Sequence, residues 1–193
     1  MRMRQRGWVA VLYLILATAF VAMGVWQVGK PPERLSEAEI AELREEYPVF
    51  PLAFPPMVDG RFPTLDELIV DVDFFVYGEV IEKYYNYRYT IRVIQDTEGF
   101  YEKGEEITIR NGIMFADYTV SFEEGMKIVY GAGVSKKDAK ETGYIGVGTY
   151  YVTEDGYVLS AFPEEPKTMK WHRPYTGVKV EYLLRKLRKP RWR

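Results

Sequence analysis

The side chains that carry acid–base and nucleophilic chemistry are few in this chain of 193 residues. It contains no cysteine, so disulfides, zinc–thiolate sites and thiol catalysis are excluded. The single histidine, His172, lies in a basic segment before a proline, with no acid close in sequence to orient it. No G-x-S-x-G nucleophile motif is present. We therefore predict no catalytic residue and expect that the protein is not an enzyme.

Acidic and glycine-rich segments do not define a metal or cofactor site. Asp71 and Asp73, with Asp66 or Glu67, could offer several oxygens to calcium, but their spacing is not that of a calcium loop. The glycines at 143, 146 and 148 lack the lysine and the strand–helix unit of a phosphate loop, and predict a loop or an irregular strand. We predict no metal and no cofactor. A surface hydrolase with an acid-only or metal-assisted site remains an alternative, since any two acids can meet in a fold.

Aromatic side chains concentrate in the segment YYNYRY at residues 84–89. Strand alternation places Tyr87 and Tyr89 on the core face, which leaves Tyr84 and Tyr85 in the turn, beside Arg88, as candidate ligand-binding residues. Small β-barrels stack sugars or bases on such aromatics, and outside the cell a sugar is the favoured ligand class. Packing of these tyrosines in the core or at its rim is the alternative.

Charge is unevenly distributed along the chain. Residues 30–165 carry 13 basic and 27 acidic side chains, a net −14, whereas residues 166–193 carry ten basic and one acidic, a net +9. The overall charge of −2 does not favour a nucleic-acid partner. The basic end predicts contact with anionic lipid or a cell-surface polymer; a solvated tail, or one folded back on the acidic body, is the alternative. The predicted contact residues are Arg185, Lys186, Arg188, Lys189, Arg191, Trp192 and Arg193.

Residues 7–28 form an uncharged, apolar segment of 22 residues, long enough to cross a bilayer as one helix. Trp8 and Trp26 lie near its ends, and three arginines precede it. Arginines stay on the cytoplasmic side, so the pattern predicts a single-pass signal anchor with a cytoplasmic N-terminus and an extracytoplasmic C-terminal domain. Cleavage of a signal peptide after the Ala-Thr-Ala at 17–19 is the alternative.

The elements that follow the anchor are mainly short strands. Ser36 and Glu39 have capping-box spacing before a short helix over 35–47, whose outer face is acidic and predicts a solvated helix. Alternating or bulky runs begin at residues 74, 87, 106, 126, 150 and 157, separated by glycine turns, and predict antiparallel strands. Apolar residues at 180, 183, 184 and 187 predict an amphipathic helix docked on the strands, with Thr176 as its cap. The fold class is a small antiparallel barrel with short flanking helices.

The succession VDFFVYGEV, YRYTIRV, KGEEITIRN, EEGMKIVYGAG and GTYYVTEDG resembles small exported β-domains of bacterial surface proteins and lipoproteins. The resemblance covers roughly residues 64–188 and implies a five-stranded barrel similar to the OB fold. This chain lacks the cysteine that carries lipid in the lipoproteins, and the helical anchor would take that role.

Three segments are expected: a cytoplasmic tip and anchor at 1–29, an acidic helix with a proline-rich connector at 30–63, and the β-domain with its C-terminal helix and basic tail at 64–193. Together these features predict a membrane-anchored extracytoplasmic domain that binds or scaffolds an unidentified ligand. An accessory subunit of a membrane complex is the second interpretation, with a membrane protein as its partner.

Overall fold

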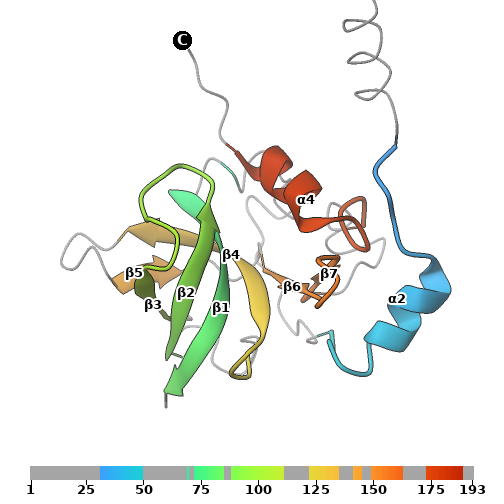
Figure 1. Cartoon of the computed structure of the whole chain (residues 1–193), viewed down its shortest axis with the longest axis horizontal. Coiled ribbons are helices and arrows are strands. Elements are labelled where there is room, and N and C mark those ends of the chain that lie inside the picture. Colours follow the sequence, from blue (N-terminus) through green and yellow to red (C-terminus); the bar gives the residue numbers. More distant parts are fainter. Residues whose placement is uncertain are drawn as a thin grey trace, which may run out of the picture. The chain divides into compact units, whose positions relative to one another are not determined.

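The computed structural model describes residues 31–49, 69, 72–84, 88–110, 122–134, 141–144, 149–162 and 173–188. Residues Glu33–Arg193 form one compact unit. Its described elements are α2 (Glu37–Leu43), β1 (Phe74–Tyr84), β2 (Arg88–Asp96), β3 (Glu106–Arg110), β4 (Lys127–Val134), β5 (Glu141–Tyr144), β6 (Tyr150–Val152), β7 (Val158–Ser160) and α4 (Val180–Leu187). The prediction of a mainly β chain with short flanking helices is confirmed (Figure 1).

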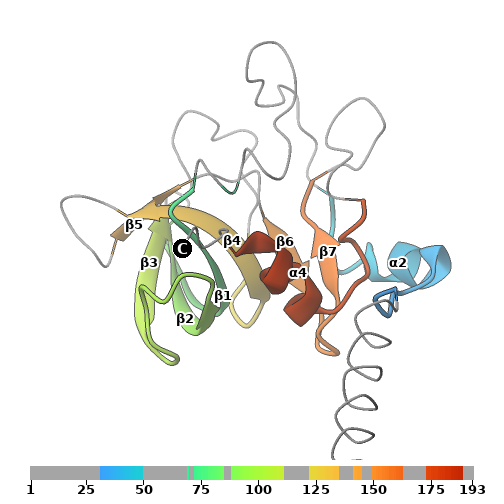
Figure 2. The ribbon, with the colours of Figure 1, turned by 90° about the horizontal axis from the view of Figure 1, so that it is seen from above.

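The seven described strands form one sheet in the order β1-β2-β3-β5-β4-β6-β7, with a further pairing between β1 and β4. Strand β4 therefore pairs with β1 as well as with β5 and β6, and the sheet is not closed into the predicted barrel. All of these pairings are antiparallel except β3–β5, which is parallel and short, with two residue pairs. The hairpin of β6 and β7 continues the sheet beyond β4, and α4 lies beside it (Figure 2).

Strand β1 can pair on both edges because it is long and bent. Its register with β2 shifts between Tyr77 and Gly78 and again between Val80 and Glu82. Such irregularities bend a strand and increase its twist. At Gly78 a Cβ atom would lie 2.8 Å from the backbone oxygen of Arg92, so the close approach of β2 at this bend requires glycine.

The core lies between the inward faces of these strands, as the alternation predicts. Tyr89, Ile91 and Val93 of β2 are at most 1% exposed, whereas Arg92 between them is exposed. An aromatic cluster fills one end: the ring of Phe122 packs 5.1 Å from that of Tyr89, 6.4 Å from Tyr130 and 6.3 Å from Tyr151. These large buried rings supply much of the apolar area that the strands remove from water.

The C-terminal helix follows the predicted apolar stripe. Val180, Leu183, Leu184 and Leu187 of α4 are all buried, and Arg185 and Lys186 lie in its last turn, where cations interact favourably with the helix dipole. The prediction that Thr176 caps the helix is wrong. The N-cap is Lys179, without a side-chain capping bond, and the Thr176 hydroxyl instead accepts a hydrogen bond from the Ser160 amide at 3.4 Å.

Helix α2 begins with the predicted capping box. The Ser36 hydroxyl accepts from the Glu39 amide at 3.3 Å, and the Glu39 carboxylate accepts from the Ser36 amide at 2.7 Å. The acidic outer face is exposed as expected, but the helix is not solvated all round. Ile40 is 8% exposed and Tyr47 is 6% exposed, and both belong to the core of the unit.

Replacing Ser36 by alanine should destabilise the unit by about 1 kcal/mol, the usual effect of removing a serine cap. The hydrogen bonds from Ser36 hold the pKa of Glu39 below its ordinary value. A carboxyl with a lowered folded-state pKa stabilises at pH values above its unfolded pKa and loses that contribution as the pH falls. The Ser36→Ala variant should therefore also return the Glu39 pKa toward its ordinary value, which an NMR titration of the Glu39 side chain measures. A Glu39 titration identical in both proteins would contradict the bond that the Ser36 hydroxyl donates to the Glu39 carboxylate at 2.6 Å.

Strand β5 was not among the predicted strands, although the glycines at 143, 146 and 148 were expected to form a loop or an irregular strand. Gly143 lies in this strand, paired with Gly133 of β4. Four residues without strong alternation carry little strand signal, and only the neighbouring strands fix them in the sheet.

Candidate functional site

The outward face of β1 and β2 brings together Tyr84 and Arg88, the two predicted ligand-binding residues that the structure describes. Register pairs Tyr84 with Arg88 at the end of the β1–β2 ladder. The next outward row joins Glu82 of β1 to Thr90 of β2, and Thr90 in turn pairs with Thr108 of β3. Alternation along each strand therefore puts Tyr84, Glu82, Arg88 and Thr90 on one surface, named here the Tyr84 face.

The Tyr84 ring is oriented by its own neighbours. Its hydroxyl donates a short hydrogen bond to the Glu82 carboxylate and accepts one from the Thr90 hydroxyl at 3.3 Å. Its side chain is 41% exposed, one of only three large apolar or aromatic residues exposed in the described part of the chain. A tyrosine held at its hydroxyl and open at its ring presents a flat apolar surface with polar groups at one edge.

The charges on this part of the sheet are balanced. Arg92 of β2 pairs with Glu106 of β3 at 3.4 Å, and both side chains are about half exposed. Arg88 is half-buried and Glu82 is exposed. By register, Arg92 lies between Glu79 of β1 and Glu106 of β3, and Arg88 lies opposite Arg110 of β3, so basic and acidic residues alternate across the three strands. An exposed pair of this kind adds little stability, so its main effect is to keep donors and acceptors in place.

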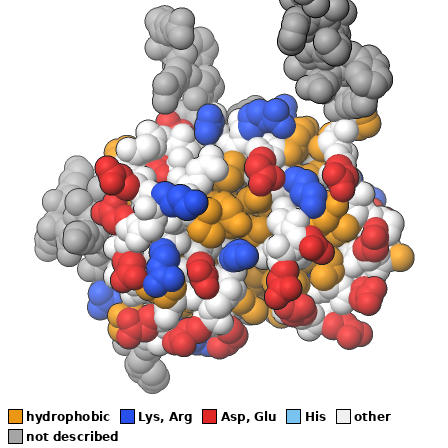
Figure 3. Space-filling view, viewed as in Figure 1, with side chains coloured by type: hydrophobic (Ala, Val, Ile, Leu, Met, Phe, Trp, Pro, Cys, Tyr) orange, Lys and Arg blue, Asp and Glu red, His pale blue; other side chains and the backbone are white. Residues whose placement is uncertain are grey.

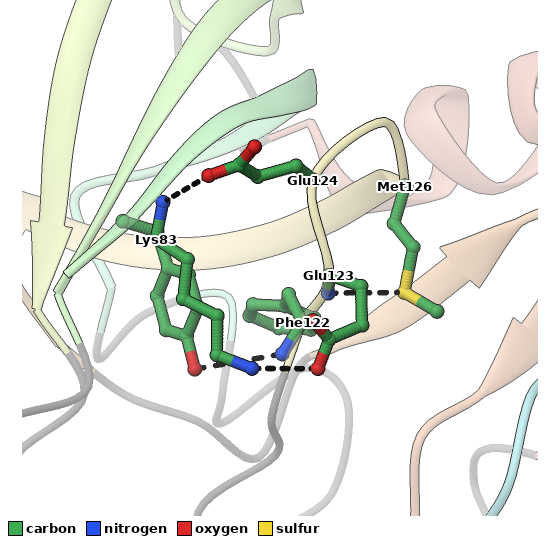
Figure 4. Close-up of polar contacts among 6 residues, drawn as sticks. Lys83, Phe122, Glu123, Glu124 and Met126 are labelled. Atoms are coloured by element: carbon green, nitrogen blue, oxygen red, sulfur yellow. Dashed lines mark hydrogen bonds and ion pairs between the residues drawn. The ribbon is translucent and has the colours of Figure 1, made fainter. Parts of the chain in front are cut away.

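A turn before β4 supports the end of β1 next to Tyr84 (Figure 4). The Lys83 ammonium pairs with Glu123 at 2.6 Å, and the Lys83 amide donates to the Glu124 carboxylate at 3.3 Å. Behind this turn the Phe122 amide donates to the Tyr89 hydroxyl at 3.4 Å, which links it to the aromatic core. The exposed end of β1 is therefore held by the turn before β4 as well as by its pairing with β2.

The other predicted site residues are placed as follows. Tyr85 lies outside the described residues, as do Lys189, Arg191, Trp192 and Arg193. Arg185, Lys186 and Arg188 are exposed on α4 and at its end. Glu82 and Thr90 were missed by the sequence reasoning, although their two-residue spacing from Tyr84 and Arg88 was a usable signal.

Of the acids considered for metal binding, the structure describes only Asp73. Asp73 is exposed, and Asp66, Glu67 and Asp71 lie outside the described residues, as does His172. Among the described side chains, no group of three or more His, Cys, Asp or Glu could hold a metal ion.

Neither the known protein-family models nor the curated proteins contain a match to this chain. Within the described residues no helix is long and apolar enough to cross a membrane, and the predicted anchor at 7–28 lies outside them.

Proposed function

We propose that this chain is a membrane-anchored extracytoplasmic binding domain of the OB type, and that its Tyr84 face binds a neutral oligosaccharide. The exposed, oriented ring of Tyr84 carries the proposal. It combines an open aromatic surface with hydroxyl and carboxylate groups at its edge.

The strand order supports an OB-type architecture. The neighbour relations β1-β2-β3-β5-β4-β1, with β3 and β5 parallel, are those expected of a five-stranded, partly open barrel with a Greek-key path. Proteins of this architecture bind oligonucleotides and oligosaccharides on the face formed by strands 2 and 3. The Tyr84 face lies on β1 and β2, so it shares β2 with that binding face.

The chemistry of the face favours a neutral sugar over a nucleic acid. A nucleic-acid surface needs an excess of lysine and arginine, because phosphate neutralisation supplies most of the affinity. Here Arg92 is paired with Glu106, and Glu82 lies beside Tyr84. A pyranose ring has an apolar C–H face that an aromatic ring can cover, and hydroxyls that bond to threonine, glutamate and arginine.

The sequence supports the anchored, extracytoplasmic part of the proposal. The uncharged segment at 7–28 has the length of one membrane-spanning helix, and Arg2, Arg4 and Arg6 precede it. Outside the cell, glycans are abundant ligands for such a face, so the location and the site chemistry agree.

The affinity of Tyr84 variants tests this function. The full chain, reconstituted in nanodiscs, is titrated with cellohexaose and with chitohexaose. Changing Tyr84→Ala should weaken binding about five- to 150-fold, because stacking on one aromatic ring contributes about 1–3 kcal/mol in comparable nucleobase complexes. Tyr84→Phe keeps the ring and should retain most of the affinity.

Phe100 provides the matched control, because its side chain is 56% exposed in the loop between β2 and β3, outside the Tyr84 face. Phe100→Ala should leave the affinity unchanged. Equal losses from the Tyr84 and Phe100 variants would exclude the Tyr84 face as the binding site. Absence of binding to both oligosaccharides would exclude the proposed ligand class.

A further inference from the structure

From the contacts around α4 we infer that the domain binds the surface of the membrane that anchors it, through the basic edge of α4 and with anionic lipid head groups as the partner. This inference rests on the proposed membrane anchor. Three sets of observations carry it: a clamp between the start of the unit and the segment before α4, the chemistry of the α4 surface, and the length of chain ahead of the clamp.

The first residues of the unit are held tightly by the segment before α4. The Leu35 amide donates to the Gly177 carbonyl at 2.9 Å, and Arg34 forms a β-bridge with Val178. The Arg34 guanidinium also donates to the Arg173 carbonyl at 2.9 Å. These contacts are named here the N-terminal clamp.

Side chains reinforce the N-terminal clamp. The Tyr157 hydroxyl donates to the Glu33 carboxylate at 2.5 Å, and this bond raises the pKa of Tyr157 above its ordinary value. The Lys179 ammonium lies 3.6 Å from the centre of the Tyr157 ring and donates to the Asp155 carbonyl at 2.9 Å.

Gly177 fits this junction because its backbone has φ +79°, a conformation that favours glycine, and a Cβ atom there would lie 3.0 Å from Ile40 Cδ1. The N-terminal clamp therefore holds the start of the unit in a fixed position against the start of α4.

The exposed edge of α4 has the chemistry of a membrane-surface contact. The guanidinium of Arg185 and the ammonium of Lys186 lie 5.6 and 5.7 Å from the centre of the Tyr182 ring. Arg188 follows them and is exposed, whereas Glu181 is the only acid on the helix. A tyrosine surrounded by cations suits the boundary between lipid head groups and acyl chains. Each Lys or Arg near an anionic surface adds to the attraction.

Chain length brings this edge within reach of the bilayer. Glu33 follows Val28, the end of the apolar segment, by five residues. Five extended residues span about 17 Å at most. The helical rise of about 1.5 Å per residue places the basic side chains only about 10 Å further along α4 from the N-terminal clamp. A tether this short gives the α4 edge a high effective concentration at the head groups.

The charge distribution agrees with this orientation. On the face drawn in Figure 3, basic side chains are spread over the upper and middle parts with acidic ones among them, and the lower edge is mainly acidic. In Figure 1 strand β1 runs away from α4 toward its C-terminal end, where Tyr84 lies. Lipid contact at α4 would therefore leave the Tyr84 end of β1 away from the bilayer.

The experiment uses the full chain in nanodiscs that contain anionic phosphatidylglycerol and lipids with a nitroxide quencher in the head group. Because the chain has no cysteine, one fluorophore can be attached at a single introduced position. One protein carries it at Glu181→Cys on α4, and a second at Glu124→Cys in the turn before β4. Co-migration with the nanodiscs is measured first. Failure to co-migrate would overturn the anchor and, with it, this inference.

With the anchor inserted, we expect at least threefold stronger quenching at position 181 than at position 124. The double change Arg185→Glu with Lys186→Glu should remove most of that difference, as should 0.5 M salt, since exposed charges are then largely screened. The control double change, Lys103→Glu with Lys127→Glu, alters the net charge by the same amount. It should leave the difference in quenching between positions 181 and 124 unchanged. Equal quenching at both positions, or equal effects of the two double variants, would overturn the contact while leaving the anchor established.

Discussion

Replacing Leu184 and Leu187 together by alanine should remove most of the stability of the domain. Both side chains are at most 2% exposed and pack in the core. A buried leucine changed to alanine costs about 2–5 kcal/mol, while a whole domain is stable by about 5–15 kcal/mol. The two residues are neighbours, so their effects need not add. Urea unfolding of the full chain in detergent, followed by near-ultraviolet circular dichroism, gives the midpoint of the transition.

Arg185 is the control on the same helix, because it is exposed between the two leucines. Arg185→Ala should shift the unfolding free energy by no more than about 0.5 kcal/mol, the usual range for surface changes. An unchanged midpoint in the double leucine variant would mean that α4 does not belong to the cooperative unit.

The second large effect is expected at Phe122, at the junction of the core and the Tyr84 face. Its side chain is fully buried and its ring contacts those of Tyr89, Tyr130 and Tyr151. Phe122→Ala should cost about 3–5 kcal/mol by opening a cavity. It should also loosen the turn that fixes Lys83 through Glu123, and so weaken oligosaccharide binding at Tyr84.

Unfolding and binding are both measured for Phe122→Ala. Phe100→Ala, which removes the same side chain from an exposed position, serves as the control for both. A Phe122 variant as stable as the Phe100 variant would show that the aromatic cluster does not support the fold. If Phe122→Ala lowers the stability as expected but leaves the affinity for oligosaccharide unchanged, the turn before β4 does not support binding at the Tyr84 face.

The elements that local chemistry determines were predictable from the sequence. The capping box of Ser36 and Glu39 specifies the start of α2 through bonds between residues three apart. The apolar positions of α4 and the alternation of β2 each repeat with the period of their element. In such cases the residue pattern itself decides which face is buried.

Features that depend on distant contacts were not predictable. Thr176 is of a residue type that often caps helices, but its hydroxyl accepts a hydrogen bond from the Ser160 amide of strand β7. Helix α4 begins three residues after Gly177. Strand β5 exists through its pairing with β3 and β4 rather than through its own sequence. Tyr84 was expected in the turn, but it is the last residue of β1; it is exposed, and its bond to Thr90 depends on the register between β1 and β2.

The packing of α2 on the unit also comes from distant contacts. An acidic face indicates solvent on one side of a helix and leaves the other side undetermined. Ile40 lies close to Gly177, far away in the chain, and the Arg44 guanidinium donates to the Ser160 carbonyl at 2.6 Å. These contacts make the acidic helix part of the folded domain.

Chemical-shift mapping tests the central claim most directly. The isotope-labelled full chain in nanodiscs is titrated with chitohexaose and cellohexaose, and the backbone and side-chain resonances are followed. We predict that the largest concentration-dependent shifts for at least one of the two sugars occur at Tyr84, Glu82, Arg88 and Thr90, and that Tyr84→Ala abolishes them. Shifts centred elsewhere in the domain, or no shifts with either sugar, would contradict a saccharide-binding Tyr84 face.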